Sequence, residues 1–181
     1  MRVPITYMLT IALSFFSVGN LYSQSETIET TGDVFLFAIP ATALGATLLK
    51  NDTKGTWQFA KGFVLNQALT FSLKKIISKP RPDLSNNDSF PSGHTSITFQ
   101  GASFIHKRYG IKYGIPAYLL TGFTAYSRIK ADKHDGYDVL AGAIIGVGST
   151  YLFTTPYQKE HLELTYTSFE KNHMIGFKYS F

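Results

Sequence analysis

The chain has 181 residues, with 17 Lys or Arg against 12 Asp or Glu, and therefore a net charge of +5. This length corresponds to one domain of ordinary size. Hydrophobic residues make up 44% and charged residues only 16%, which excludes a disordered chain and hints at a membrane protein. Cysteine is absent, which excludes disulfides, thiolate metal sites, a cysteine nucleophile and a lipoprotein anchor.

Residues 1–23 have the pattern of an export signal. Arg2 supplies a positive start, residues 5–18 form an apolar stretch, and Ser23 is a small residue suited to cleavage. The alternative is an uncleaved first membrane helix. In both cases the chain that follows starts outside the cytoplasm.

Five apolar segments follow, and each predicts a helix. We expect a polar linker over residues 24–33 in front of them, and charged residues, glycine or proline end each segment. The expected fold is therefore all-α, a bundle of five apolar helices within a domain over residues 24–160. The predicted helices cover residues 34–49, 57–77, 95–105, 111–126 and 137–153.

The first and fifth of these helices are apolar enough to span a membrane. The second contains polar residues and the third is short, so a soluble exported helical domain is the alternative. If the chain starts outside, an alternating path puts the basic loops at 50–54 and 107–108 inside, as the positive-inside rule requires. Two further basic loops, at 74–81 and 128–133, remain outside and need a functional reason.

In residues 161–181 the spacing of apolar residues changes, and in two runs every second residue is apolar. Apolar residues alternate over 162–166 and again over 175–181, and a polar stretch at 170–173 separates the two runs. This pattern predicts a short C-terminal β-hairpin. We interpret it as a packing appendage.

The first of three polar clusters consists of Lys74, Arg81 and Pro82. Lys74 and Arg81 are seven residues apart and would share one helical face if the helix continued that far. The prolines around Arg81 instead force the chain to leave the helix near residue 78. By itself, such a pair is usually a solvated helix end.

The second cluster is the tetrapeptide Pro91-Ser92-Gly93-His94, directly before the third predicted helix. Ser92 can cap that helix, and Gly93 lets the backbone approach a ligand closely. The amides of the first turn then point at any anion bound there, with His94 at the mouth of the site.

The third cluster is Ser127-Arg128, followed by His134 and Asp138. His134 and Asp138 are four residues apart, so they share one helical face. A carboxylate placed there can accept the proton of one imidazole nitrogen and leave the other free as a nucleophile. Zinc is a poorer interpretation, because the cluster lacks a three-ligand spacing.

Together the clusters predict phosphoryl transfer, because the alternating path places all three on one side. Lys74, Arg81 and Arg128 would neutralise phosphate oxygens, and Ser92 with the amides of Gly93 and His94 would add donors. His134 would attack phosphorus, oriented by Asp138. His94 would protonate the leaving oxygen and later activate water. No metal or other cofactor is needed, because fixed cations replace it. The catalytic set is thus His134, His94 and Asp138, and the phosphate-binding set is Lys74, Arg81, Ser92, Gly93 and Arg128.

These motifs closely resemble the three-part signature of the type 2 phosphatidic acid phosphatase superfamily. The signature K-x6-RP, PSGH and SR-x5-H-x3-D matches without a departure between residues 74 and 138. The resemblance implies a helical bundle, metal-independent hydrolysis of a phosphomonoester or diphosphate, and the same roles for the same residues. Membrane members usually have six spans, and cleavage after residue 23 would leave five here.

The expected function is hydrolysis of a phosphorylated lipid at the outer face of the inner membrane, with the active site facing the periplasm. The alternative is a soluble, periplasmic acid phosphatase acting on small phosphate esters. A vanadate-dependent haloperoxidase and a non-catalytic phosphate-binding membrane protein are further alternatives. We expect no nucleic-acid partner.

Overall fold

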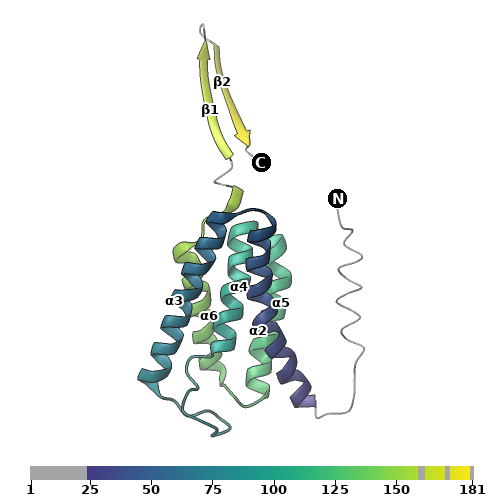
Figure 1. The fold of residues 1–181 in the computed structure, drawn as a ribbon, viewed down its shortest axis with the longest axis vertical. Helices are drawn as coiled ribbons and strands as arrows, with labels where there is room; N and C mark the ends of the chain where they lie inside the picture. Colours follow the sequence, from purple (N-terminus) through teal and green to yellow (C-terminus); the bar gives the residue numbers. More distant parts are fainter. Residues whose placement is uncertain (1–23, 159–161, 170–171, 180–181) are drawn as a thin grey trace.

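The computed structural model describes residues 24–158, 162–169 and 172–179, and this part of the chain forms five helices and one hairpin (Figure 1). The all-α bundle with a C-terminal hairpin is confirmed. The predicted export signal, residues 1–23, lies outside the described residues. The helices are α2 (Gln24–Leu49), α3 (Thr53–Ile77), α4 (Gly93–Tyr109), α5 (Ile111–Lys130) and α6 (Gly136–Phe153).

The first helix starts earlier than predicted. The interpretation of residues 24–33 as a linker is wrong, because α2 begins at Gln24. Glu26 lies in the first turn, where the positive end of the helix dipole favours a carboxylate. Glu26, Glu29 and Asp33 follow one another at spacings of three and four residues, so they share one face of α2.

Helix α4 is the centre of the bundle and packs against α2, α3, α5 and α6 (Figure 1). Ser92 caps its first turn, as predicted. The crossing with α6 is close, since a Cβ on Gly142 would lie 2.5 Å from the carbonyl oxygen of Ser92. The backbone N–H of Ser92 also donates to the carbonyl of Asp138 (2.9 Å). The first turns of α4 and α6 are therefore fixed against each other.

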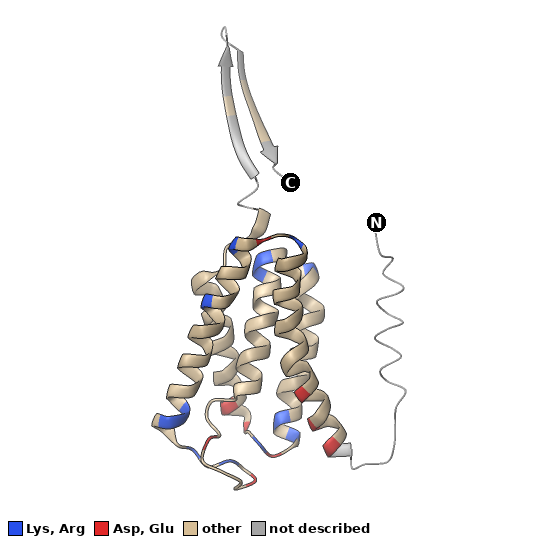
Figure 2. Cartoon of the chain, viewed as in Figure 1, with Lys and Arg blue, Asp and Glu red and all other residues tan. Residues whose placement is uncertain are grey.

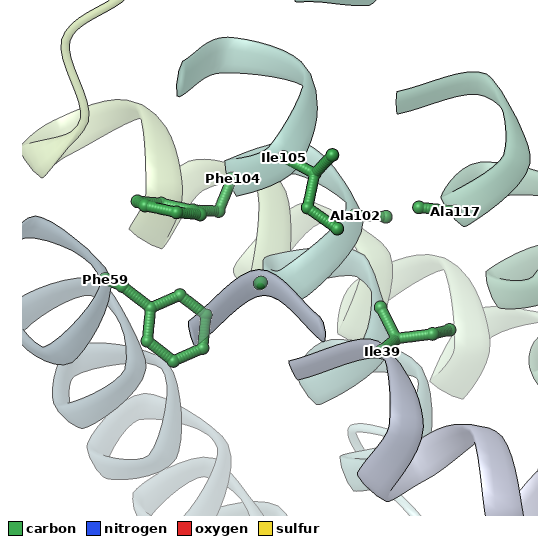
Figure 3. Packing of buried hydrophobic residues seen from close by; sticks show 7 residues of the cluster. Ile39, Phe59, Ala102, Phe104, Ile105 and Ala117 are labelled. Carbon is green, nitrogen blue, oxygen red and sulfur yellow. The ribbon is translucent and has the colours of Figure 1, made fainter. Parts of the chain in front are cut away.

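The bundle is polar inside and apolar outside. Its apolar core is a small cluster between α2, α3, α4 and α5 (Figure 3), and buried Thr, Ser, Asn and Gln side chains occupy much of the remaining interior. Large apolar side chains instead face outward, for example Phe37 at 73% and Leu152 at 72% exposure. Exposed apolar surface of this extent indicates a partner or a membrane around the bundle. The core residues are Ile39, Ala43, Phe59, Ala102, Phe104, Ile105 and Ala117.

Charged residues lie mainly at the two ends of the bundle (Figure 2). At the end formed by the α2–α3 and α4–α5 turns, Arg108 makes a buried ion pair with Asp52 through Nη2 (2.5 Å) and Nε (2.7 Å). The hydroxyl of Tyr109 donates to the same carboxylate (2.9 Å). Hydrogen bonds to the Asp52 carboxylate therefore hold this end of the bundle together. The predicted motifs lie at the opposite end.

The C-terminal hairpin is also confirmed. Strand β1 (Leu162–Phe169) pairs antiparallel with β2 (Asn172–Tyr179), and Tyr166 stands opposite Ile175 in the register. The role of the hairpin as a packing appendage stays a prediction.

Candidate active site

The three polar clusters meet at one end of the bundle. The α3–α4 loop and the α5–α6 loop are neighbours there, and the amide of Asp83 donates to the carbonyl of Asp132 (3.0 Å). A cavity of about 340 Å³ opens between these loops and α2. Four of the residues singled out in the sequence line it: Arg81, His94, Arg128 and His134.

The two arginines differ in how they are held. Arg81 follows the end of α3, which stops at Ile77, so it does not share a helical face with Lys74. Its Nε is buried without a hydrogen-bond partner in the described part of the chain. Arg128 is buried on α5, and its Nη2 donates to the carbonyl of Glu29 (2.7 Å). A buried guanidinium donor without a partner, such as that of Arg81, suits an anionic ligand.

Lys74, Ser92 and Gly93 lie next to the cavity but do not line it. The ammonium of Lys74 donates to the carbonyls of Asp88 (2.6 Å) and Pro91 (2.7 Å), so it holds the loop that leads into α4. Gly93 lies beside Lys74, since a Cβ there would be 3.9 Å from Cε of the lysine. Ser92 is fully buried as the cap of α4.

His134 is buried in the loop before α6, and its backbone N–H donates to the carbonyl of Arg128 (3.2 Å). Its Nδ1 lies 3.8 Å from Oδ2 of Asp138, which is too long for a hydrogen bond. In this structure the carboxylate therefore acts on the imidazole through its electrostatic field and not through a hydrogen bond. Burial, and then the charges of Lys74 and Arg81, lower the pKa of His134 to about 4, although Asp138 opposes them.

Asp138 is the centre of a hydrogen-bond network behind His134. Asp135 caps α6 and forms a capping box with Asp138, which fixes the first turn of this helix. Oδ2 of Asp138 accepts from the hydroxyl of Ser89 (2.6 Å) and from the amide of Asp135 (3.0 Å), and Oδ1 accepts from Lys79 (2.8 Å). Burial lowers the pKa of Lys79, but the hydrogen bonds to Asp135 and Asp138 outweigh it and raise the pKa overall.

The sequence interpretation missed several residues of the site. Lys79 and Ser89 lie within the matched region but outside its signature positions. Glu29 and Asp33 lie on the stretch interpreted as a linker, yet both line the cavity. Their spacing on one helical face was the signal that could have placed them. Lys133 also lines the cavity and pairs with Asp83 (2.8 Å).

The lowered pKa of His134 predicts where this ring is protonated. A group with a pKa of about 4 in the fold stays neutral until the pH falls to that value, well below the ordinary 6.5. We expect an NMR titration of the His134 ring, assigned by its loss in His134→Gln, to show a midpoint near pH 4. A midpoint near 6.5 would mean that the ring is solvated and not held next to Lys74 and Arg81.

Comparisons with known proteins agree with this fold. A family model described as the PAP2 superfamily matches residues 55–161, more than half of the chain. A lipid A 4'-phosphatase of Helicobacter pylori is 31% identical over 142 residues, which cover 72% of this chain and 71% of that protein. A lipid A 1-phosphatase of the same strain is 30% identical over 158 residues, covering 82% of each. The crystal structure of LpxE from Aquifex aeolicus aligns with a TM-score of 0.61 at 22% identity, over 71% of this chain and 83% of that one.

The helical bundle and these relatives define the class of the protein, which is a phosphoric ester hydrolase. The chain belongs to the PAP2 superfamily, as the resemblance in its three motifs predicted.

Proposed function

We propose that this protein removes phosphate from a membrane lipid through a phosphohistidine formed on His134, without a metal ion. One observation supports this proposal above the others. Two imidazoles and two guanidiniums, from three separate sequence motifs, line one cavity of about 340 Å³. Binding of phosphate alone would require the guanidiniums but not both histidines.

In the proposed reaction, Arg81 and Arg128 bind the phosphate oxygens and stabilise the charge of the transition state. Nε2 of the neutral His134 attacks phosphorus while the bond to the leaving oxygen breaks. His94 gives its proton to that oxygen. His94 then takes a proton from water, which attacks phosphorus, breaks the N–P bond and releases inorganic phosphate.

The donor set of the site favours fixed cations over a metal ion. In the part of the chain that the structure describes, no group of three or more His, Asp or Glu is arranged to hold a metal. Arg81, Arg128 and Lys133 line the cavity instead and supply positive charge directly. In this proposal the cations perform the charge neutralisation that a metal performs in other phosphatases.

A lipid is the substrate that the surroundings of the site favour. An apolar groove of about 440 Å³ between α2 and α3 shares Leu36 and Phe37 with the charged cavity, so an acyl chain can lie directly beside a bound phosphate. The relatives described above are named as lipid A phosphatases. We therefore propose a phosphorylated glycolipid of the lipid A type as the substrate class.

The charge distribution supports a site on the outer side of the membrane. Two helices, Glu26–Leu49 and Gly136–Phe153, are long and apolar enough to cross a bilayer. The far end of the bundle is strongly basic (Figure 2), with Asp52 as the acidic residue of its two turns. That end obeys the positive-inside rule if it faces the cytoplasm. The catalytic end then faces the periplasm, and the Lys and Arg of its two loops are exceptions that the site requires. The basic residues of these turns are Lys50, Lys54, Lys107, Arg108 and Lys112.

The test is phosphate release by the purified protein in detergent from a panel that contains lipid A, phosphatidate and soluble phosphate esters. We expect turnover of the lipids, strongest on lipid A, and no loss of activity in EDTA. Inhibition by EDTA that added metal reverses would exclude the metal-free mechanism. Equal turnover of soluble esters by protein extracted without detergent would favour the soluble acid phosphatase instead.

A further inference from the structure

We propose that Asp33, which lies outside the three sequence motifs, is the positioning residue of the general acid: its carboxylate orients His94 and favours the protonated ring before the leaving group departs. The proposal rests on the phosphatase function proposed above. It assigns a role to the first part of α2, which the polar sequence of residues 24–33 does not reveal.

The geometry around Asp33 is specific. Its Oδ1 lies 2.9 Å from Nε2 of His94 and 2.9 Å from Nη1 of Arg128, so one carboxylate oxygen bridges the two. Nδ1 of His94, the other ring nitrogen, has no hydrogen-bond partner in the described part of the chain, and the ring lines the cavity. The hydrogen bond to Asp33 therefore leaves Nδ1 for the substrate.

The backbone of α2 is placed to make this contact. A Cβ on Gly32 would collide with the hydroxyl of Ser127, so only glycine lets α2 approach α5 this closely. One turn earlier on α2, the carbonyl of Glu29 accepts from Nη2 of Arg128 (2.7 Å). Asp33, next to Gly32, is thereby held against the site by two contacts that do not involve its own side chain.

The charges around His94 explain why a carboxylate is needed there. Arg81 and Lys133 from the loops and Arg128 from α5 line the same cavity, and all three disfavour a positive imidazole. On α2, Glu29 lies 3.9 Å from Arg128, whereas Asp33 contacts His94 directly. Burial and the charge of Arg128 lower the pKa of His94 overall, and Asp33 is the group that opposes this shift. A general acid that must be protonated at neutral pH requires such a partner.

The His94 imidazolium, with Nε2–H donated to Asp33, gives its Nδ1 proton to the leaving oxygen as the P–O bond breaks. The ring, now neutral, keeps the proton on Nε2, where it stays hydrogen-bonded to Asp33. In the second half-reaction Nδ1 takes a proton from the attacking water, which restores the imidazolium. Asp33 itself gains and loses no proton.

The experiment compares Asp33→Asn with Glu26→Gln, a control carboxylate on the same helix. Single-turnover release of the leaving group is measured with an alkyl phosphate lipid, which needs a general acid, and with a nitrophenyl phosphate, whose leaving group does not. We expect Asp33→Asn to slow alkyl release by about 10²-fold, to affect nitrophenyl release far less, and to move the alkaline limb of the pH profile to lower pH. Glu26→Gln should behave as wild type on both.

Three outcomes would overturn the proposal. Equal losses on both substrates, with the pH profile unmoved, would assign Asp33 to binding or to stability. Wild-type rates on both would show that Asp33 is dispensable. Faster turnover and tighter vanadate binding in Asp33→Asn would mean that the carboxylate only occupies the phosphate position. The proposed function fails differently, because wild type would then release no leaving group from either substrate.

Discussion

Replacement of His134 by Ala is expected to abolish phosphate release, with a loss of at least about 10³-fold in kcat. His134 is the buried, neutral imidazole of the cavity, and its low pKa leaves the ring available for attack on phosphorus at any pH above about 4. Without it, Arg81 and Arg128 still bind phosphate, so the affinity for vanadate should fall far less than the rate. Steady-state kinetics and vanadate inhibition measure the two effects separately.

The covalent step is tested by trapping. Acid-labile, base-stable label from a radioactive substrate should appear on wild-type protein and be absent from His134→Ala. His106→Gln is the matched control, since His106 lies at the far end of α4, where its Nδ1 is 3.4 Å from the hydroxyl of Tyr118. Label on His134→Ala at the wild-type level would place the phosphohistidine elsewhere and remove the proposed role of His134.

The sequence predicted the part of the site that follows from local rules. The end of α3 near residue 78 follows from proline chemistry, and the start of α4 follows from the cap at Ser92. The apolar segments located all five helices, although α4 and α5 extend some residues beyond the segments that predicted them. The loops that carry the motifs lie at one end of the bundle because successive helices run in opposite directions.

What the sequence did not predict depends on contacts between elements. The pairing of Lys79 with Asp138 joins residues 59 positions apart, and the contact of Asp33 with His94 joins residues 61 apart. Neither pair lies on one helix, so no periodicity links its members. The linker interpretation failed because residues 24–33 are polar, yet they form a helix on which Glu29 and Asp33 face the cavity while Glu26 and Thr27 are exposed.

The structure also explains the basic loops that break the positive-inside rule. At the catalytic end, Lys133 pairs with Asp83 and Lys79 pairs with Asp135 and Asp138. Two cations of these loops are thus paired with carboxylates at the same end of the bundle (Figure 2). The rule counts Lys and Arg with little regard to acidic residues, so these two loops remain exceptions to it. The functional reason is that Arg81, Arg128 and Lys133 line the cavity.

Asp138→Asn is the second substitution with a large expected effect, a loss of about 10³-fold in kcat with little change in KM. The Asp138 carboxylate faces Nδ1 of His134 at 3.8 Å, and positive charge develops on this ring when Nε2 bonds to phosphorus. A shorter contact in the reacting complex would stabilise that charge. Asparagine keeps the size of the side chain but removes its charge. The pH profile should move as well, because Asp138 raises the pKa of His134 and its loss shifts the acid limb to lower pH.

A structural role for Asp138 predicts a different pattern, and Lys79→Gln separates the two. The carboxylate also holds the loops together through Ser89, Asp135 and Lys79, so its loss could act through the fold alone. Lys79→Gln breaks the same ion pair yet leaves the charge next to His134. If Asp138 acts on the imidazole, Lys79→Gln keeps most of the activity while Asp138→Asn does not, even where both lower the melting temperature equally. Equal losses of activity in the two variants would show that the network positions the loop and that the charge of Asp138 does not assist the reaction.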